Sequence, residues 1–231
     1  MNIPIRKKWG QNFLIDPNII RKIISVLNPK EKQTILEIGP GKGALTKILS
    51  MMHLNINAVE IDPMLCDYLK KQKFDNVKIY NEDILKFDCS IMPKNYLVIG
   101  NLPYNISTPI LFKFIENHGW SKMVVMLQKE VAERIVSHEA NKKYGRISIM
   151  MQSFFDISLE FNIPKTVFKP QPKINSSVLL IKPKKDVNVQ YKNLKIIVEN
   201  AFKHRRKKLI HNLKNILKSD VLNEIKDKRA E

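Results

Sequence analysis

Short apolar runs alternate with segments of helical spacing over residues 34–138, and this alternation limits the chain to few folds. The runs are predicted strands and the segments predicted helices; strands are expected at 34–38, 57–61, 77–80, 97–100 and 123–127, and helices at 44–52, 63–71, 108–117 and 129–138. Parallel strands are usually joined by helices, which then cover both faces of the sheet. The sequence therefore predicts an α/β fold built on a mostly parallel sheet.

Two regions outside this alternation extend the prediction. Asp16 and Pro17 have the residue types of an N-cap and a first helical position, and apolar residues then recur at helical spacing to residue 27. Apolar runs at 158–163 and 177–181 are expected to complete the sheet as a hairpin-like edge of two strands.

A glycine turn joins the first predicted strand to the helix after it, with glycines at 39, 41 and 43. Glycine allows a tight turn and a close approach of the backbone to a ligand. The spacing from Gly39 to Ala44 also satisfies the dinucleotide-binding fingerprint, so the turn alone leaves a dehydrogenase and a methyltransferase open. A P-loop is excluded, because no Gly-Lys-Ser/Thr stands at the required spacing.

Acidic residues follow the next two predicted strands. Glu60 lies where a carboxylate is expected to bind ribose hydroxyls, and Asp83 follows the third strand. Because the carboxyl ends of parallel strands meet at one edge of a sheet, we expect both acids to line the same crevice as the glycine turn.

Asn101-Leu102-Pro103-Tyr104 follows the fourth predicted strand and is the most specific motif. Asn-x-Pro-Tyr at this place is the signature of enzymes that methylate an exocyclic amine of a base. The Asn101 oxygen and a nearby backbone carbonyl could hold both protons of adenine N6, and Pro103 fixes a rigid turn. Tyr104 offers a flat face on which an extruded base can stack. A dehydrogenase has no use for this motif.

The charge balance indicates a polyanionic partner. The chain has 40 Lys and Arg against 22 Asp and Glu, a formal net charge of +18, and a protein this basic commonly binds nucleic acid. No apolar stretch approaches the ~18 residues of a membrane span, and no secretory signal is visible. Cys66 and Cys89 are isolated in the sequence, which favours a reducing cytoplasm. The His residues are scattered without metal-ligand spacing, so no metal site is predicted.

Composition changes near residue 183. Residues 184–231 hold 14 Lys and Arg against 6 Asp and Glu, and no Gly. Two or three amphipathic helices fit this segment. We therefore expect a first domain at 1–183 and a small basic helical domain at 184–231.

The chain resembles the small-subunit ribosomal RNA adenine N6,N6-dimethyltransferases. The motifs that carry the resemblance follow in order over nearly the whole chain, at 10–14, 37–46, 60–62, 82–83, 101–107, 127–132, 168–176 and 202–209. The resemblance implies a Rossmann-like class I methyltransferase with a seven-stranded sheet, which takes its methyl group from S-adenosylmethionine. Related proteins continue past an Arg-Ala-Glu like that at 229–231, so the C-terminal domain is expected to be incomplete.

The resemblance also implies a role for individual residues. The implied cofactor contacts are Gln11, Asn12, Leu14, Gly39, Gly41, Glu60, Asp83 and Asn101. The implied catalytic residues are Asn101, Leu102, Tyr104 and Phe168. Tyr104 and Phe168 are expected to sandwich the target adenine. Four consecutive cations are expected to lie on a basic RNA-binding helix, namely Arg205, Arg206, Lys207 and Lys208.

The function implied by the resemblance is methyl transfer, twice to each of two adjacent adenosines in a loop near the 3′ end of small-subunit rRNA. The expected partner is an immature small ribosomal subunit. The enzyme itself is expected to be monomeric and cytoplasmic. Two alternatives stay open here: an antibiotic-resistance methyltransferase acting on large-subunit rRNA, and a non-catalytic nucleic-acid-binding factor on the same scaffold. A dehydrogenase fits least well.

Overall fold

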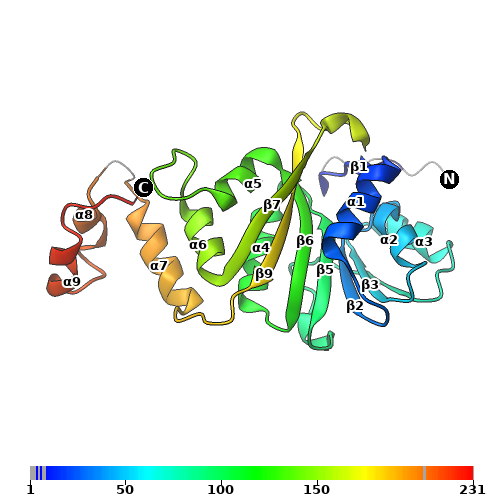
Figure 1. Ribbon diagram of the computed structural model, residues 1–231, viewed down its shortest axis with the longest axis horizontal. Helices are drawn as coiled ribbons and strands as arrows, with labels where there is room; N and C mark the ends of the chain where they lie inside the picture. The colour runs from blue at the N-terminus through cyan, green and yellow to red at the C-terminus, as the bar shows by residue number, and fades with distance from the viewer. Residues whose placement is uncertain (1–3, 5, 7–8, 205–206, 231) are drawn as a thin grey trace. The chain divides into compact units, whose positions relative to one another are not determined.

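A seven-stranded sheet forms the centre of the fold in this computed structural model, which describes residues 4, 6, 9–204 and 207–230. Its strand order is β4-β3-β2-β5-β6-β9-β7 (Figure 1). The strands are β2 (Thr34–Ile38), β3 (Asn55–Glu60), β4 (Val77–Asn81), β5 (Tyr96–Asn101), β6 (Trp120–Gln128), β7 (Phe155–Ile163) and β9 (Ser176–Pro183). β2 to β6 pair in parallel, and β9 runs antiparallel to β6. The predicted mostly parallel, seven-stranded sheet is confirmed.

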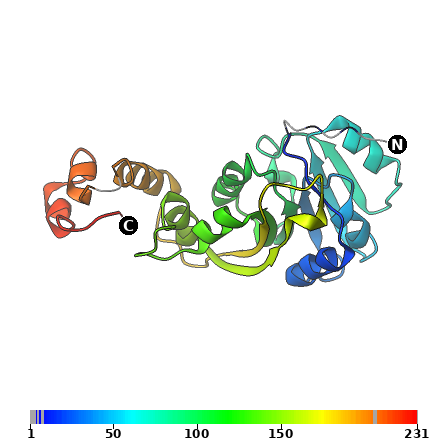
Figure 2. The ribbon, with the colours of Figure 1, turned by 90° about the horizontal axis from the view of Figure 1, so that it is seen from above.

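Helices cover both faces of this sheet, with α1 on one face and α4 on the other (Figure 2). The helices up to β7 are α1 (Pro17–Leu27), α2 (Ala44–Leu49), α3 (Pro63–Lys70), α4 (Ser107–Glu116), α5 (Lys129–Val136) and α6 (Arg146–Phe154). Short 3-10 turns lie at Cys89–Ile91 and Lys165–Val167. Each predicted helix in this region is present, within a few residues of its predicted ends.

α1 shows how the sequence builds one layer. Asp16 accepts the backbone N–H groups of Asn18 and Ile19, which caps the helix start. The buried face carries Ile20, Ile23, Ile24 and Leu27. These side chains join a core that includes residues of β2, β5 and β6, and each such fully buried side chain contributes ~1.5–3 kcal/mol.

Two strands and one helix were not predicted. A two-stranded sheet pairs β1 (Phe13–Leu14) with β8 (Phe168–Lys169), residues that lie far apart in sequence and give no local periodic signal. Helix α6 precedes β7, and its apolar residues were not recognised as a helix. β7 itself starts at Phe155 rather than 158 and alternates buried with more exposed residues, as an edge strand with one solvated face does.

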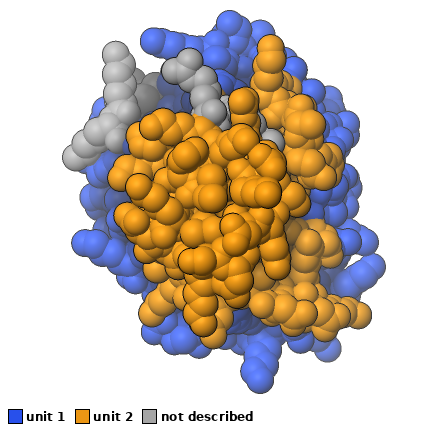
Figure 3. All heavy atoms as spheres, turned by 90° about the vertical axis from the view of Figure 1, so that its left-hand side faces the viewer, with its two compact units in different colours: residues 1–132, 157–183 blue, residues 133–156, 184–231 orange. Residues whose placement is uncertain are grey.

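The chain divides into two compact units (Figure 3): Met1–Ala132 with Ile157–Pro183, and Glu133–Asp156 with Lys184–Glu231. One division coincides with the predicted boundary at 183 and 184. The structure differs from the prediction in that residues 133–156 belong to the second unit, where α6 contacts α7 (Tyr191–Ala201).

The C-terminal segment contains α7, α8 (Leu209–Leu213) and α9 (Ser219–Glu224), which agrees with two or three helices. The predicted basic helix over 202–209 is wrong: Lys207 and Lys208 precede α8 in non-helical backbone. Arg205 and Arg206 lie outside the described residues. None of the helices in the described part of the chain has the length and apolarity needed to cross a membrane.

Candidate active site at the carboxyl edge of the sheet

A pocket of about 960 Å³, part of it open to solvent, lies in the first unit where β2, β3, β4 and β5 end. Ten of the eleven predicted cofactor-binding and catalytic residues line this pocket: Gln11, Asn12, Leu14, Gly39, Gly41, Glu60, Asp83, Asn101, Leu102 and Tyr104. The structure therefore brings together residues from four strand ends and an N-terminal segment.

The glycine turn needs its glycines for conformation and for space. Gly39, Gly41 and Gly43 all have positive φ angles, of +63°, +58° and +78°, a region that other residues adopt only with strain. A Cβ on Gly41 would lie 3.0 Å from the Phe13 ring. The turn can therefore run directly beneath the N-terminal segment that covers it.

Gly100 brings the neighbouring strand end close to this turn. A Cβ at this position would lie 2.6 Å from the carbonyl oxygen of Ile38, so only glycine allows β5 to approach β2 this closely. Asn101, the next residue, is thereby placed beside the start of the glycine turn.

Glu60 links the glycine turn to the end of β3. Its Oε2 accepts the N–H of Gly41 at 3.0 Å, and its Oε1 accepts the N–H of Asp62 at 2.9 Å. Burial raises the pKa of this carboxyl, while the two backbone donors oppose that shift. Each oxygen retains acceptor capacity, so the carboxylate can also receive two hydroxyl groups from a ligand.

Glu60→Gln is expected to weaken binding of a ribose-containing ligand by at least tenfold, because one acceptor oxygen becomes a donor facing a hydroxyl or an N–H group. Gln retains the shape of the side chain and one acceptor for the backbone. Calorimetric titration with S-adenosylmethionine measures the effect, with the exposed Glu31→Gln as the control for lost charge. Equal affinities in the three proteins would remove Glu60 from the ligand site.

Asp83 lies at the adjacent edge of the pocket. Its Oδ1 accepts the N–H of Leu85 at 2.9 Å, which fixes the turn after β4. The carboxylate is thus held in place by its own backbone and lies on the same pocket wall as Ile84.

Asn101 has a defined amide orientation. Its Nδ2 donates to the backbone carbonyl of Asn12 at 2.8 Å. The amide nitrogen is therefore engaged, and Oδ1 remains as an acceptor at the wall of the pocket. This orientation suits an amine ligand that brings protons of its own.

Tyr104 is anchored through its hydroxyl. The Tyr104 Oη and the Ser176 Oγ on β9 lie 2.6 Å apart, and burial raises the pKa of the Tyr104 phenol. The half-buried ring lines the pocket. Tyr104 thus presents a fixed aromatic surface next to Asn101.

Phe168 does not line the pocket. It pairs with Leu14 in the β1–β8 sheet, and its side chain is only 3% exposed within the core. A stacking role requires the ring to become accessible, so its part in sandwiching an adenine stays a prediction.

Glu37 is a pocket residue that the sequence reasoning passed over. It is 1% exposed, and neither carboxyl oxygen makes a hydrogen bond of good geometry among the described residues, although the Thr46 hydroxyl and N–H lie close enough to oppose a rise in its pKa. Burial raises the pKa of this carboxyl to about 7. The available signal was an acid inside an otherwise apolar strand, immediately before the glycine turn.

Glu37→Gln is expected to change the dependence of stability on pH. The folded-state pKa of about 7 lies above the ordinary 4.5, so the wild type loses stability as pH rises from about 4.5 through 7, whereas the Gln variant does not. The difference amounts to ~3 kcal/mol. In thermal unfolding, the stability of the Gln variant relative to the wild type should be clearly higher at pH 8 than at pH 5. An equal difference at the two pH values would contradict a buried carboxyl with a raised pKa.

No group of three or more His, Cys, Asp or Glu side chains that could hold a metal ion is found among the described residues.

Comparison with known proteins identifies relatives over almost the full length. A sequence model of the family described as ribosomal RNA adenine dimethylase matches residues 2–230. The chain is 48% identical over 224 residues to the ribosomal RNA small subunit methyltransferase A of Francisella tularensis subsp. novicida, covering 92% of this chain and 85% of that protein.

Solved structures give the same picture of the fold. A dimethyladenosine transferase from Plasmodium falciparum superposes with a TM-score of 0.80 at 28% identity, over 93% of this chain and 78% of that one. The 23S rRNA methyltransferase ErmE superposes with a TM-score of 0.72 at 24% identity, over 89% and 84%. The second likeness bears on the fold alone.

Proposed function

This chain belongs to the ribosomal RNA adenine dimethylase family, and we propose that its pocket positions adenine N6 of small-subunit rRNA for two successive methyl transfers. The enzyme is an adenine dimethyltransferase that uses S-adenosylmethionine. Its proposed target is a pair of adjacent adenosines in a loop near the 3′ end of that RNA. The observation that carries the proposal is the orientation of Asn101, which lines the pocket and has its Nδ2 engaged by the Asn12 carbonyl, so that Oδ1 is left as its acceptor.

The pocket residues fit S-adenosylmethionine. The glycine turn has no Cβ at Gly39 and Gly41, both of which line the pocket, and Glu60 offers acceptors for two ribose hydroxyls. Glu37 and Asp83 add acidic groups to the walls, which suits a ligand that carries positive charge. When bound, this cofactor supplies an electrophilic methyl group on a sulfonium centre.

Asn101 and the Leu102 carbonyl are proposed to accept the two N6 protons of the target adenine. This arrangement draws the amine lone pair out of conjugation with the ring and directs it into the pocket. Tyr104 is proposed to stack on the base and hold it in this position. Positioning of this kind can supply ~7–11 kcal/mol of the barrier. The proton that N6 releases after transfer can pass to solvent, so no strong general base is required.

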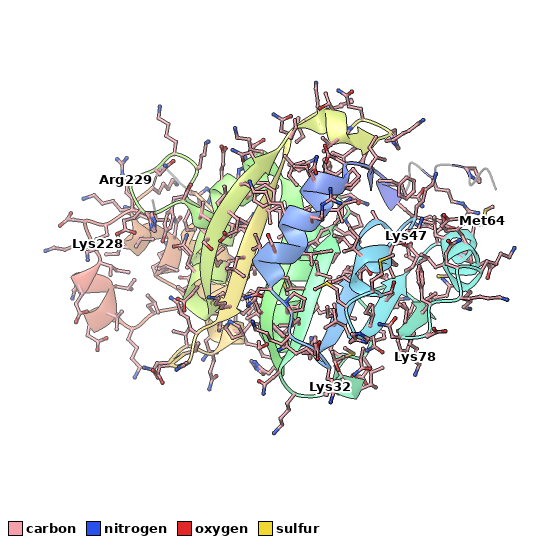
Figure 4. All side chains as sticks on the ribbon, turned by 45° about the vertical axis from the view of Figure 1, so that its right-hand side comes forward. Lys32, Lys47, Met64, Lys78, Lys228 and Arg229 are labelled. Atoms are coloured by element: carbon pink, nitrogen blue, oxygen red, sulfur yellow. The ribbon has the colours of Figure 1, made fainter. Side chains whose placement is uncertain are left out.

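Positive charge is proposed to hold the RNA. The formal net charge is +18, and exposed cations lie on both units, including Lys47 and Lys78 on the first and Lys228 and Arg229 on the second (Figure 4). Lys207 and Lys208 are exposed, and Lys208 makes a surface ion pair with Asp227 at 2.7 Å. We propose that these two lysines contact phosphates, together with Arg205 and Arg206.

The finer features of the function are also proposals. An immature small subunit is the expected form of the substrate, since a single-stranded loop must be open for its bases to be extruded. We propose that the protein acts there as a cytoplasmic monomer and contributes to subunit biogenesis. The 183/184 division is proposed to separate the methyltransferase region from a basic RNA-binding region.

Transfer of labelled methyl groups to separated ribosomal RNAs tests this function. Unmethylated small subunits should take up label, and large-subunit RNA should not. The 48% identity to a small-subunit enzyme supports this outcome over the large-subunit alternative. Label on large-subunit RNA would favour that alternative, and label on neither RNA, with S-adenosylmethionine bound, would favour a non-catalytic binding factor.

A further inference from the structure

The N-terminal arm, defined as residues 9–14, forms one wall of the pocket. A buried acid holds this arm: Gln11 Nε2 donates to Asp62 Oδ2 at 2.9 Å. Gln11 Oε1 in turn accepts the backbone N–H of Arg6 at 2.8 Å, and the Arg6 Nε lies 3.8 Å from the same Asp62 oxygen. Both ends of the Gln11 amide are therefore engaged by the protein itself.

Asp62 connects the arm to the proposed ribose carboxylate. Its side chain is completely buried, and its Oδ1 caps α3 by accepting the N–H of Met64 at 3.0 Å. Its own N–H donates to Glu60 Oε1. One residue thus joins the arm, the start of α3 and Glu60. Met64, the next residue but one, projects from the surface of α3 (Figure 4).

The other half of the arm reaches the catalytic amide. The carbonyl of Asn12 accepts Asn101 Nδ2, and the Phe13 ring lies against the glycine turn at Gly41. A displacement of the arm would therefore alter both the cover of the cofactor pocket and the orientation of Asn101.

Helix capping alone does not explain Asp62. Asp16 caps α1 with nearly the same backbone, φ −85° and ψ 115° against φ −84° and ψ 110°, and is likewise followed by Pro. Among the described residues, Asp16 accepts only helix N–H groups, through a single oxygen. Asp62 also accepts a helix N–H group with its Oδ1. Its Oδ2 accepts from the arm instead, so Asp62 has a buried acceptor that helix capping does not require.

We propose that the Gln11–Asp62 contact is a latch that fixes the arm over the cofactor pocket, so that both residues are positioning residues for methyl transfer. Gln11 then acts through Asp62, rather than as the direct cofactor contact that the family resemblance implied. This inference rests on the proposed function for its consequence, but the latch itself is a property of the free protein.

An exchange of donor and acceptor tests the latch. Asp62→Asn keeps an oxygen for the α3 cap but turns the second oxygen into a donor that faces Gln11. Gln11→Glu sets two carboxylates against each other and leaves the cap untouched. In the double variant the carboxylate introduced at position 11 can accept from the amide introduced at position 62 and from the Arg6 N–H, which restores the contact. Asp16→Asn is the matched cap control.

Hydrogen–deuterium exchange of the amides of residues 9–14, without cofactor or RNA, is the first measurement. Both single variants should exchange about tenfold faster or more in the arm, the double variant should return toward the wild type, and Asp16→Asn should match the wild type. Affinity for S-adenosylmethionine should follow the same order, with losses of about tenfold in the singles.

Wild-type exchange rates in both single variants, or a double variant no slower than the faster single, would overturn the latch. If Asp62→Asn also exchanges faster in α3, this variant has lost the helix cap. The Gln11→Glu variant, which leaves the cap intact, then decides whether the latch exists. If the wild type methylates no RNA while the exchange order holds, the proposed function fails and the latch stands.

Discussion

Asn101→Ala is expected to lower kcat by about 10²–10³, the usual cost of removing one preorganised polar group that acts on a transition state. The Asn101 oxygen interacts most strongly once N6 becomes pyramidal and begins to carry positive charge. Its amide is held in advance by the carbonyl of Asn12 at 2.8 Å, so no reorientation is needed during transfer. RNA affinity should change little, because the interaction is weak in the ground state.

Single-turnover kinetics at saturating S-adenosylmethionine measure this loss separately from cofactor binding. Asn18→Ala, an exposed position on the first turn of α1, serves as the control. Wild-type turnover in Asn101→Ala under saturating cofactor would rule out this motif as the site that holds the amine.

Tyr104→Ala is expected to lose most activity, because stacking of a base on an aromatic ring is worth ~1–3 kcal/mol. Tyr104→Phe keeps the ring but leaves the completely buried Ser176 hydroxyl without its 2.6 Å partner. Removing one member of such a pair costs more than removing both. Tyr104→Phe combined with Ser176→Ala should therefore keep most of the wild-type activity, since the ring remains and no hydroxyl is left unpaired.

Comparison of kcat/KM for RNA across these variants separates ring from hydroxyl. The Ser176→Ala single variant shows what the loss of that hydroxyl costs by itself. If the double variant were as inactive as Tyr104→Ala, with unchanged thermal stability, the hydroxyl rather than the stacking surface would be the essential feature.

The sheet could be predicted from the sequence because its parallel strands are short apolar runs, and all of them except β4 are followed by a local helix signal. β2 was predicted with its observed ends, and β5 within one residue at each end. The β1–β8 pair could not be predicted in this way, because Phe13 and Lys169 are partners only through tertiary structure. The basic segment at 207–208 was expected in a helix from the family resemblance and from its run of cations, although Lys208 is the N-cap residue of α8.

The candidate site was predictable where residue type and position at a strand end coincide. Glu60, Asp83 and Asn101 meet this condition, and all three line one pocket. Glu37 does not meet this condition, because an acid within an apolar strand does not indicate in which direction its side chain points. The latch between Gln11 and Asp62 joins residues 51 positions apart and is visible only in the folded chain.

The central claim is that this pocket dimethylates N6 of adenine in small-subunit rRNA. Its most direct test is mass analysis of nucleosides from unmethylated small subunits incubated with S-adenosylmethionine and either the wild type or Asn101→Ala. The account predicts N6,N6-dimethyladenosine with the wild type, confined to one RNA fragment near the 3′ end, and little of it with the variant over the same time. Methylation at an atom other than adenine N6, or equal dimethyladenosine from both proteins, would contradict it.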